Sequence, residues 1–342
     1  MDMQLLVGSS PHLRDADSIS QIMWSVVLAL VPAVAMSIYF FGAGAVIVYL
    51  VSIAAAEAAE LVCLRLRGKP LSYALDGSAF VTGTLLAMVL PPGVAWYCPA
   101  VGGVFAIVIA KHTFGGLGNN IWNPALAARV FLQFAYPAQV SLAQWPTPRL
   151  LWGHAVDAVT SASSHGAHAV TMASPLAREG IVVPLSHVDL FFGNGVAGSL
   201  GETCKAALLI GGLFLIIRRI VDWRIPACYI GTVFVLSWLL PAGKEPAGWA
   251  RDPLYQVLSG GLVIGAFFMA TDMVTTPVTG LGRVIFAAGC GLLVVVIRRY
   301  GGYPEGVAFS IIIMNTAVPL IDRWVRPRVY GSRTPKPVPR EA

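Results

Sequence analysis

Charged side chains are scarce in this chain. Only 12% of its 342 residues are Asp, Glu, Lys or Arg, whereas 56% are hydrophobic. A soluble globular domain carries about a quarter charged residues, so this deficit excludes an ordinary soluble domain. Several apolar stretches approach the roughly 20 residues that a helix needs to cross a bilayer. The composition therefore predicts an all-α polytopic membrane protein surrounded by lipid.

Cysteine is also scarce, and no two cysteines lie close together in the sequence. The two cysteines nearest to each other in the sequence are Cys204 and Cys228, and no two of the five form a C-x-x-C pair. This spacing indicates neither a zinc site nor an iron–sulfur site, and we predict no metal site. We expect each cysteine to pack as a small apolar side chain, with a cluster ligand shared with another subunit as the alternative.

The first 20 residues lack the basic, apolar and small-residue sections of a secretory signal, so we expect the N-terminus to be retained. The net charge is +6, but the excess lies in short loops and in the C-terminal tail. Such placement is typical of membrane topology rather than of nucleic-acid binding, and no nucleic-acid partner is predicted.

Apolar runs predict ten membrane crossings, near residues 20–41, 44–64, 72–90, 97–112, 120–138, 203–221, 226–241, 256–271, 284–298 and 304–322. If the N-terminus is cytoplasmic, fifteen of the 23 Lys and Arg residues fall inside and seven fall outside. Basic residues prefer the cytoplasmic side, so both termini are predicted to be cytoplasmic.

The two halves resemble each other when the second is moved back by 182 to 186 residues. Pro70 then meets Pro253, and Gly115-Gly116 meets Gly301-Gly302. Each half has an odd number of crossings, so the fold is predicted as two inverted five-helix repeats with broken helices. Chance matching of glycine and proline is the alternative. The predicted organisation is a cytoplasmic N-terminal segment (1–19), a first membrane repeat (20–138), an outer loop (139–202), a second inverted repeat (203–322) and a basic cytoplasmic tail (323–342).

Three carboxylates lie in or beside apolar segments, namely Asp76, Asp272 and Glu305. A charge at membrane depth costs at least about 2.5 kcal/mol unless it is paired or hydrated, so these residues are candidates for an ion path. Two of them belong to glycine-to-proline segments, 75–93 and 258–282, that predict broken helices. The alternatives are that the carboxylates sit at the interface or cap the broken helices, and that the glycines only permit close helix packing.

Three amides, Asn119, Asn120 and Asn123, gather just before Pro124. Together with backbone N–H groups they could bind a neutral polar ring system, and turn formation is the alternative. The outer loop contains a hydroxyl-rich pattern twice, as Thr160-Ser-Ala-Ser163 and as Thr171-Met-Ala-Ser174. By composition alone this loop is a polar linker.

Seven strings resemble, in the same order, the D subunits of the bacterial Rnf complex and their relatives, the B subunits of the sodium-pumping NADH:quinone oxidoreductase. They are SSPHLRDADSIS (9–20), DGSAFVTGTLLAMVLPP (76–92), FGGLGNNIWNPA (114–125), GSLGET (198–203), GAFFMATDMVTTPVT (265–279), GGYPEGVAF (301–309) and PLIDRWVRPRVYG (319–331). The resemblance implies a protein of the bacterial inner membrane that is not catalytic alone. Its complex exchanges electrons between ferredoxin and NAD while moving Na⁺ or H⁺.

The resemblance also implies the cofactors and partners. It implies an FMN bound through a phosphodiester in the outer loop, a riboflavin in the membrane part, and neighbouring subunits with iron–sulfur clusters and a second covalent flavin. The family attachment pattern has Asp, then Ser or Thr, then Ala, the acceptor Thr and Pro-Leu. The copy with Thr171 and Ser174 has His168 in place of Asp. It keeps the Pro-Leu that follows the acceptor, so Ser174 is the preferred acceptor. Ser163, whose copy keeps the Asp, is the alternative.

The sequence is also compatible with two other functions. A passive channel or transporter for a small polar solute would also use an inverted repeat with amide-lined breaks. It would need no hydroxyl acceptor and should purify colourless, whereas an electron carrier should purify yellow. A scaffold that only holds redox partners would tolerate loss of both serines.

Overall fold

The computed structural model describes residues 18–140, 186–196, 198–240, 252–301 and 305–326, and within these ranges the chain is helical, with no strand. The first part of the chain forms α1 (Ile19–Phe41), α2 (Ala43–Leu66), η1 (Leu71–Asp76), α3 (Ser78–Met88), α4 (Tyr97–Phe105), η2 (Ala106–His112), α5 (Pro124–Ala135) and α6 (Pro137–Val140). The later part forms α8 (His187–Phe192), η4 (Leu200–Glu202), α9 (Lys205–Ile217), α10 (Arg224–Leu239), α11 (Pro253–Leu258), α12 (Leu262–Ile264), η6 (Gly265–Met269), α13 (Gly280–Tyr300) and α14 (Val307–Trp324).

Four helices, α1, α2, α13 and α14, are long and apolar enough to cross a membrane. Their outward side chains include Leu50 at 64% exposure. A large apolar side chain in that position is expected of a helix that faces lipid. These helices confirm a membrane protein, whereas the five other apolar helices, of 10–17 residues, leave the number of crossings a prediction.

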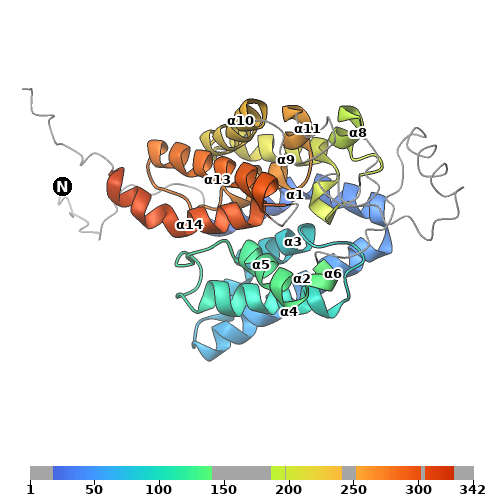
Figure 1. The fold of residues 1–342 in the computed structure, drawn as a ribbon. Coiled ribbons are helices and arrows are strands. Elements are labelled where there is room, and N and C mark those ends of the chain that lie inside the picture. The colour runs from blue at the N-terminus through green and yellow to red at the C-terminus, as the bar shows by residue number, and fades with distance from the viewer. Residues whose placement is uncertain (1–17, 141–185, 197, 241–251, 302–304, 327–342) are drawn as a thin grey trace, which may run out of the picture.

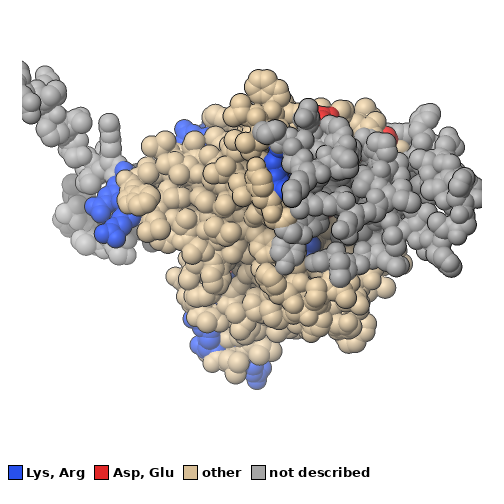
Figure 2. Space-filling view, viewed as in Figure 1, with Lys and Arg blue, Asp and Glu red and all other residues tan. Residues whose placement is uncertain are grey.

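The two parts of the chain lie one above the other in Figure 1, with α2 to α6 below and α9 to α14 above. Helix α1 lies between them and packs most extensively on α9. Gly211 of α9 permits this contact, because a Cβ added there would lie 1.9 Å from the carbonyl oxygen of Ala29. Charged groups are few on the face seen in Figure 2, where Lys and Arg gather at the margins, including the lower tip over the end of α2.

The helix is interrupted at both predicted breaks. In the first, Gly77 takes a φ of 84° between η1 and α3, and α3 ends at Met88, before Pro91. In the second, Gly260 takes a φ of 68° between α11 and α12, and the chain continues as a short π-helix, η6. Glycine adopts this left-handed conformation without the steric cost that other residues incur, which explains its place at both breaks.

The end of the segment predicted as an outer loop is packed against the helices. Leu190 of α8 is fully buried beside Tyr255 of α11. The backbone N–H of Leu200 donates to the carbonyl of Leu90, which follows α3, at 3.1 Å. Residues 186–202 are therefore held by both parts of the chain, apart from Ala197, which lies outside the described residues.

The link between α9 and α10 is tied to α13 by an ion pair. Arg283 Nη1 lies 2.8 Å from Asp222 Oδ2. Partial burial disfavours the charged carboxylate, but the Arg224 backbone N–H and the Arg283 guanidinium outweigh it and hold the pKa of Asp222 below its ordinary value.

The cysteines behave as expected. All five are free, and four of them are buried, with Cys228 partly exposed.

Candidate functional site

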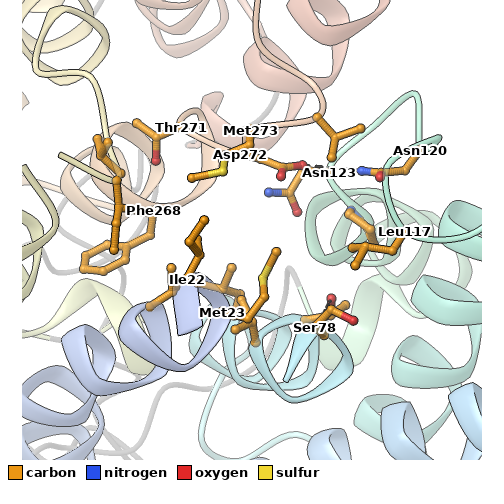
Figure 3. Close-up of a pocket in the computed structure, with 18 of the residues that line it drawn as sticks. Ile22, Met23, Ser78, Leu117, Asn120, Asn123, Phe268, Thr271, Asp272 and Met273 are labelled. Atoms are coloured by element: carbon orange, nitrogen blue, oxygen red, sulfur yellow. Dashed lines mark hydrogen bonds between the residues drawn. The ribbon is translucent and has the colours of Figure 1, made fainter. Parts of the chain in front are cut away.

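A cavity of about 100 Å³ lies between the two parts of the chain. Its lining comes from α1, α3, the 111–124 stretch, the 215–221 stretch and the link that follows η6. Figure 3 shows Ile22 and Met23 on one side and Asp272, Asn123 and Asn120 on the other. A cavity of this size holds several water molecules, provided that polar partners are present.

Asp272 supplies the carboxylate on the upper side of this cavity. It lies in the irregular link between η6 and α13, as the predicted break requires. Its Oδ2 accepts from Thr275 Oγ1 at 3.2 Å and from Asn120 Nδ2 at 3.4 Å. Both donors are neutral, so these two bonds satisfy the carboxylate without cancelling its charge.

The three predicted amides have different positions. Asn123 caps α5 by accepting from the N–H groups of Ala125 and Leu126, and its Nδ2 donates to the carbonyl of Met269 at 3.2 Å. Asn120 is buried and reaches Asp272. Asn119 is exposed and is not part of the cavity lining.

Asp76 does not line the cavity, but it is connected to a residue that does. Its Oδ1 accepts from the Ser78 backbone N–H at 2.7 Å and from Ser78 Oγ at 2.6 Å, and Ser78 is the first residue of α3, after the N-cap Gly77. A role of Asp76 in an ion path stays a prediction. Ser78 lines the cavity together with Lys111.

A buried ion pair continues from Ser78. Lys111 Nζ donates to Ser78 Oγ at 2.8 Å and to Glu60 Oε2 at 2.8 Å. His112 Nε2 approaches the same Glu60 oxygen at 3.0 Å, and its Nδ1 faces the exposed Arg67 at 3.3 Å. A row of polar groups therefore runs from the surface to the cavity.

Glu305 lies in a second polar cluster, whose members are absent from the cavity lining. Its Oε1 accepts from the Gly261 backbone N–H at 3.1 Å, at the second helix break. Its carboxylate interacts with that of Glu202, which also accepts from Ser199. Arg298 lies nearby and donates to the carbonyls of Gln256 and Ser259, which end α11. The structure thus separates Glu305 from Asp272.

Sequence reasoning missed Glu60, Lys111, Glu202 and Lys205. All four are less than 10% exposed, and Lys205 is fully buried with its ammonium on the carbonyl of Glu202. The signal was available, since each lies in or beside an apolar run, where a charge is as costly as it is for Asp272.

The predicted attachment residues Ser174, Ser163 and Thr171 lie outside the described residues.

Comparison with known proteins assigns the family. The sequence model of the NQR2, RnfD, RnfE family matches residues 6–331. The chain is 44% identical over 334 residues to the D subunit of the Na⁺-translocating ferredoxin:NAD⁺ oxidoreductase complex of Acetobacterium woodii, covering 96% of each chain. It is 42% identical over 337 residues to the D subunit of the proton-translocating ferredoxin:NAD⁺ oxidoreductase complex of Clostridium ljungdahlii, again covering 96% of each. It is 38% identical over 347 residues to the D subunit of the ion-translocating oxidoreductase complex of Halorhodospira halophila, covering 96% of this chain and 95% of the other. By both the family match and these identities, the chain belongs to the NQR2, RnfD, RnfE family.

Proposed function

We propose that the chain is the flavin-carrying membrane subunit of a ferredoxin:NAD oxidoreductase complex, and that it couples electron transfer to the movement of Na⁺ or H⁺. The names of the relatives in Acetobacterium woodii and Clostridium ljungdahlii support the reaction and the coupling. They differ in the ion, so the names alone do not choose between Na⁺ and H⁺.

The observation that carries the ion-path proposal is the cavity at Asp272. A carboxylate with neutral hydrogen-bond donors faces a space large enough for water, between two interrupted helices. Intramembrane carboxylates of this kind are typical of ion pathways. Asp272 would bind the cation, and Asn120 and Thr275 would orient the carboxylate. Glu305 would serve the path at Gly261, where the second helix break begins.

The inverted repeat is part of the proposal, and the order of the helices supports it. Two helices, α1 and α2, precede the break at Gly77, and α4 and α5 follow α3. In the second part α9 and α10 precede the break at Gly260, and α13 and α14 follow η6. Five crossings in each part would place both termini in the cytoplasm of a bacterial inner-membrane protein.

The side chains that line the cavity suit a flavin ring chemically, but the cavity is small for one. Phe268, Met23 and Met273 offer apolar surfaces, while Asn120 and Asn123 offer amide edges. Pockets that bind small molecules usually have a volume of at least about 300 Å³, whereas this cavity has a volume of about 100 Å³. To admit riboflavin, the two flexible methionine side chains would have to move and enlarge it. We propose these residues as its binding site, where the flavin would supply one-electron chemistry and the chain its position.

We propose that FMN is joined covalently to Ser174, with Ser163 as the alternative, and that Thr171 belongs to the attachment motif. A covalent tether on an outer loop keeps an exposed flavin available to a partner domain without a tight pocket. The partners would be the other membrane and peripheral subunits, which supply the iron–sulfur clusters and a second covalent flavin. The absence of C-x-x-C pairs in the sequence is compatible with that division.

The test is mass spectrometry of the intact chain and its peptides, produced in a host that has the flavin-attaching enzyme. Wild type, Ser174→Ala and Ser163→Ala are compared. We expect an added mass of FMN less one water, located in the peptide around 171–180 and lost only in Ser174→Ala. Loss only in Ser163→Ala would move the attachment to the upstream copy. An adduct in neither peptide of the wild type would reject the covalent flavin and favour the channel or the scaffold.

A further inference from the structure

The buried ion pair of Lys111 and Glu60 lies at the boundary of the cavity. The two side chains are only 3% and 4% exposed, and their charged atoms are 2.8 Å apart. Lys111 and Ser78 line the cavity, whereas Glu60 does not. The ammonium therefore stands between the Glu60 carboxylate and the cavity.

The surroundings of this ammonium hold charges of both signs. Glu57, one turn before Glu60 on α2, lies within electrostatic range of Glu60 and Lys111. On the other side of Glu60 lie His112 and, beyond it, Arg67. The charged residues in the cavity lining are Lys111 and Asp272, so a cation in the cavity reaches the Glu60 carboxylate only past the Lys111 ammonium.

The groups that hold Lys111 Nζ are also ligands for a small metal cation. Both are oxygens, one from the Glu60 carboxylate and one from the Ser78 hydroxyl. Hard cations prefer oxygen ligands, and they keep water molecules when a protein supplies few of them. Asp76 fixes Ser78 Oγ in place by accepting a hydrogen bond from its hydroxyl, which leaves the oxygen lone pairs to accept from Nζ.

We propose that Lys111 is a tethered counter-ion in a Na⁺ site formed by Glu60 Oε2 and Ser78 Oγ, and that Na⁺ from the cavity exchanges with its ammonium. This inference rests on the proposed ion-translocating function and adds a residue that controls access to the path. A lysine suits the role because its charge is a compact point on a flexible four-carbon chain. When Na⁺ binds beside Glu60, the displaced ammonium would move into the cavity, which Asp272 also lines, so that Glu60 keeps one monovalent cation at its carboxylate.

The experiment uses the whole complex, purified and reconstituted in liposomes. The apparent KM for Na⁺ is measured in ferredoxin-to-NAD electron transfer, together with ²²Na⁺ uptake. Lys111→Met removes the competing ammonium and leaves Glu60 with only the His112 ring beside it, so we expect the KM for Na⁺ to fall at least tenfold. In Lys111→Met/Glu60→Gln this gain should disappear, because the carboxylate that recruits Na⁺ is gone.

Two further variants separate the site from general effects of charge and folding. Arg67→Gln removes an exposed positive charge from the surface end of the same polar row, and its KM should stay within twofold of wild type. Ser78→Ala keeps the ion pair but removes one oxygen ligand, so its KM should rise threefold to tenfold. If Lys111→Met does not assemble, Ser78→Ala alone decides the question.

Several results would overturn the proposal. They are an unchanged or raised KM in Lys111→Met, a gain that persists in the double variant, an unchanged KM in Ser78→Ala, and wild-type activity that moves protons without any dependence on Na⁺. A wild-type complex that moves neither ion would instead reject the proposed function itself. The two failures are thus distinguishable in one set of assays.

Discussion

At the scale of single residues, Asn123 joins the start of α5 to the end of η6. Its carbonyl oxygen accepts from two N–H groups at the start of α5, at 3.1 and 3.4 Å. Its amide nitrogen crosses to the other part of the chain and meets the carbonyl of Met269 at the end of η6. One side chain therefore satisfies groups at the ends of two helices, where backbone partners are missing.

We expect Asn123→Ala to lower the free energy of unfolding by about 1–2 kcal/mol, since an N-cap alone contributes about 0.5–2 kcal/mol and the carbonyl of Met269 also loses its partner. The measurement is the Tm of the purified chain in detergent, which should fall by a few degrees. Asn119→Ala is the matched control, because Asn119 is exposed. Equal Tm values for the two variants would contradict this role.

The sequence predicts part of this site and not the rest, for a physical reason. The three amides before Pro124 are a local pattern that predicts a polar binding group or a turn, and two of them, Asn120 and Asn123, line the cavity. The bond to Met269 joins residues 146 positions apart, and the Lys111–Glu60 pair joins residues 51 positions apart. No local pattern specifies such partners, because they depend on how complete helices pack.

At the scale of helices, small residues set the distance between α1 and α9. Gly211 lies against the carbonyl group of Ala29, where a Cβ would be 1.9 Å from the oxygen and 2.9 Å from the carbon. The neighbour is backbone, which cannot rotate away as a side chain can. Membrane helices commonly use glycine in this way to approach each other closely.

Gly211→Ala should therefore push the two helices apart and destabilise the fold by about 1–3 kcal/mol, the usual effect of overpacking. Gly231→Ala on α10 is the control, since a Cβ there would meet nothing within 4 Å. Thermal unfolding of both variants in detergent tests the difference. A Gly211→Ala protein as stable as Gly231→Ala would show that α1 and α9 are not in tight contact.

The helix breaks could be predicted, whereas the packed end of the outer loop could not. Glycine and proline disfavour a continuous helix, so segments that open with glycine and end at proline, such as those of Gly77 and Gly260, can be predicted as breaks from the sequence. Residues 186–202 belong to the segment predicted as an outer loop, yet Leu190 is fully buried. Its burial depends on α11, which lies more than 60 residues later in the chain.

At the scale of the whole molecule, the basic residues predict one orientation in the membrane. A fluorescent protein fused to the C-terminus should fold and fluoresce, because it would remain in the cytoplasm. Alkaline phosphatase fused at the same place should be inactive, since it needs an oxidising compartment. Alkaline phosphatase fused within residues 141–185 should be active. The reverse activities would invert the orientation, and activity of both phosphatase fusions would contradict the five crossings predicted between the outer loop and the C-terminus.

The packing of α1 on α9 has a consequence for synthesis. Helix α1 ends at Phe41, and α9 begins at Lys205. At about 5–20 residues per second, the ribosome delivers the main partner of α1 roughly 8–33 seconds after α1 itself. During that interval the face of α1 that will meet Gly211 must be covered by lipid or by an insertion factor. Helix α1 can meet α2 and α3 soon after it is made, but its contact with α9 closes the structure only after this delay.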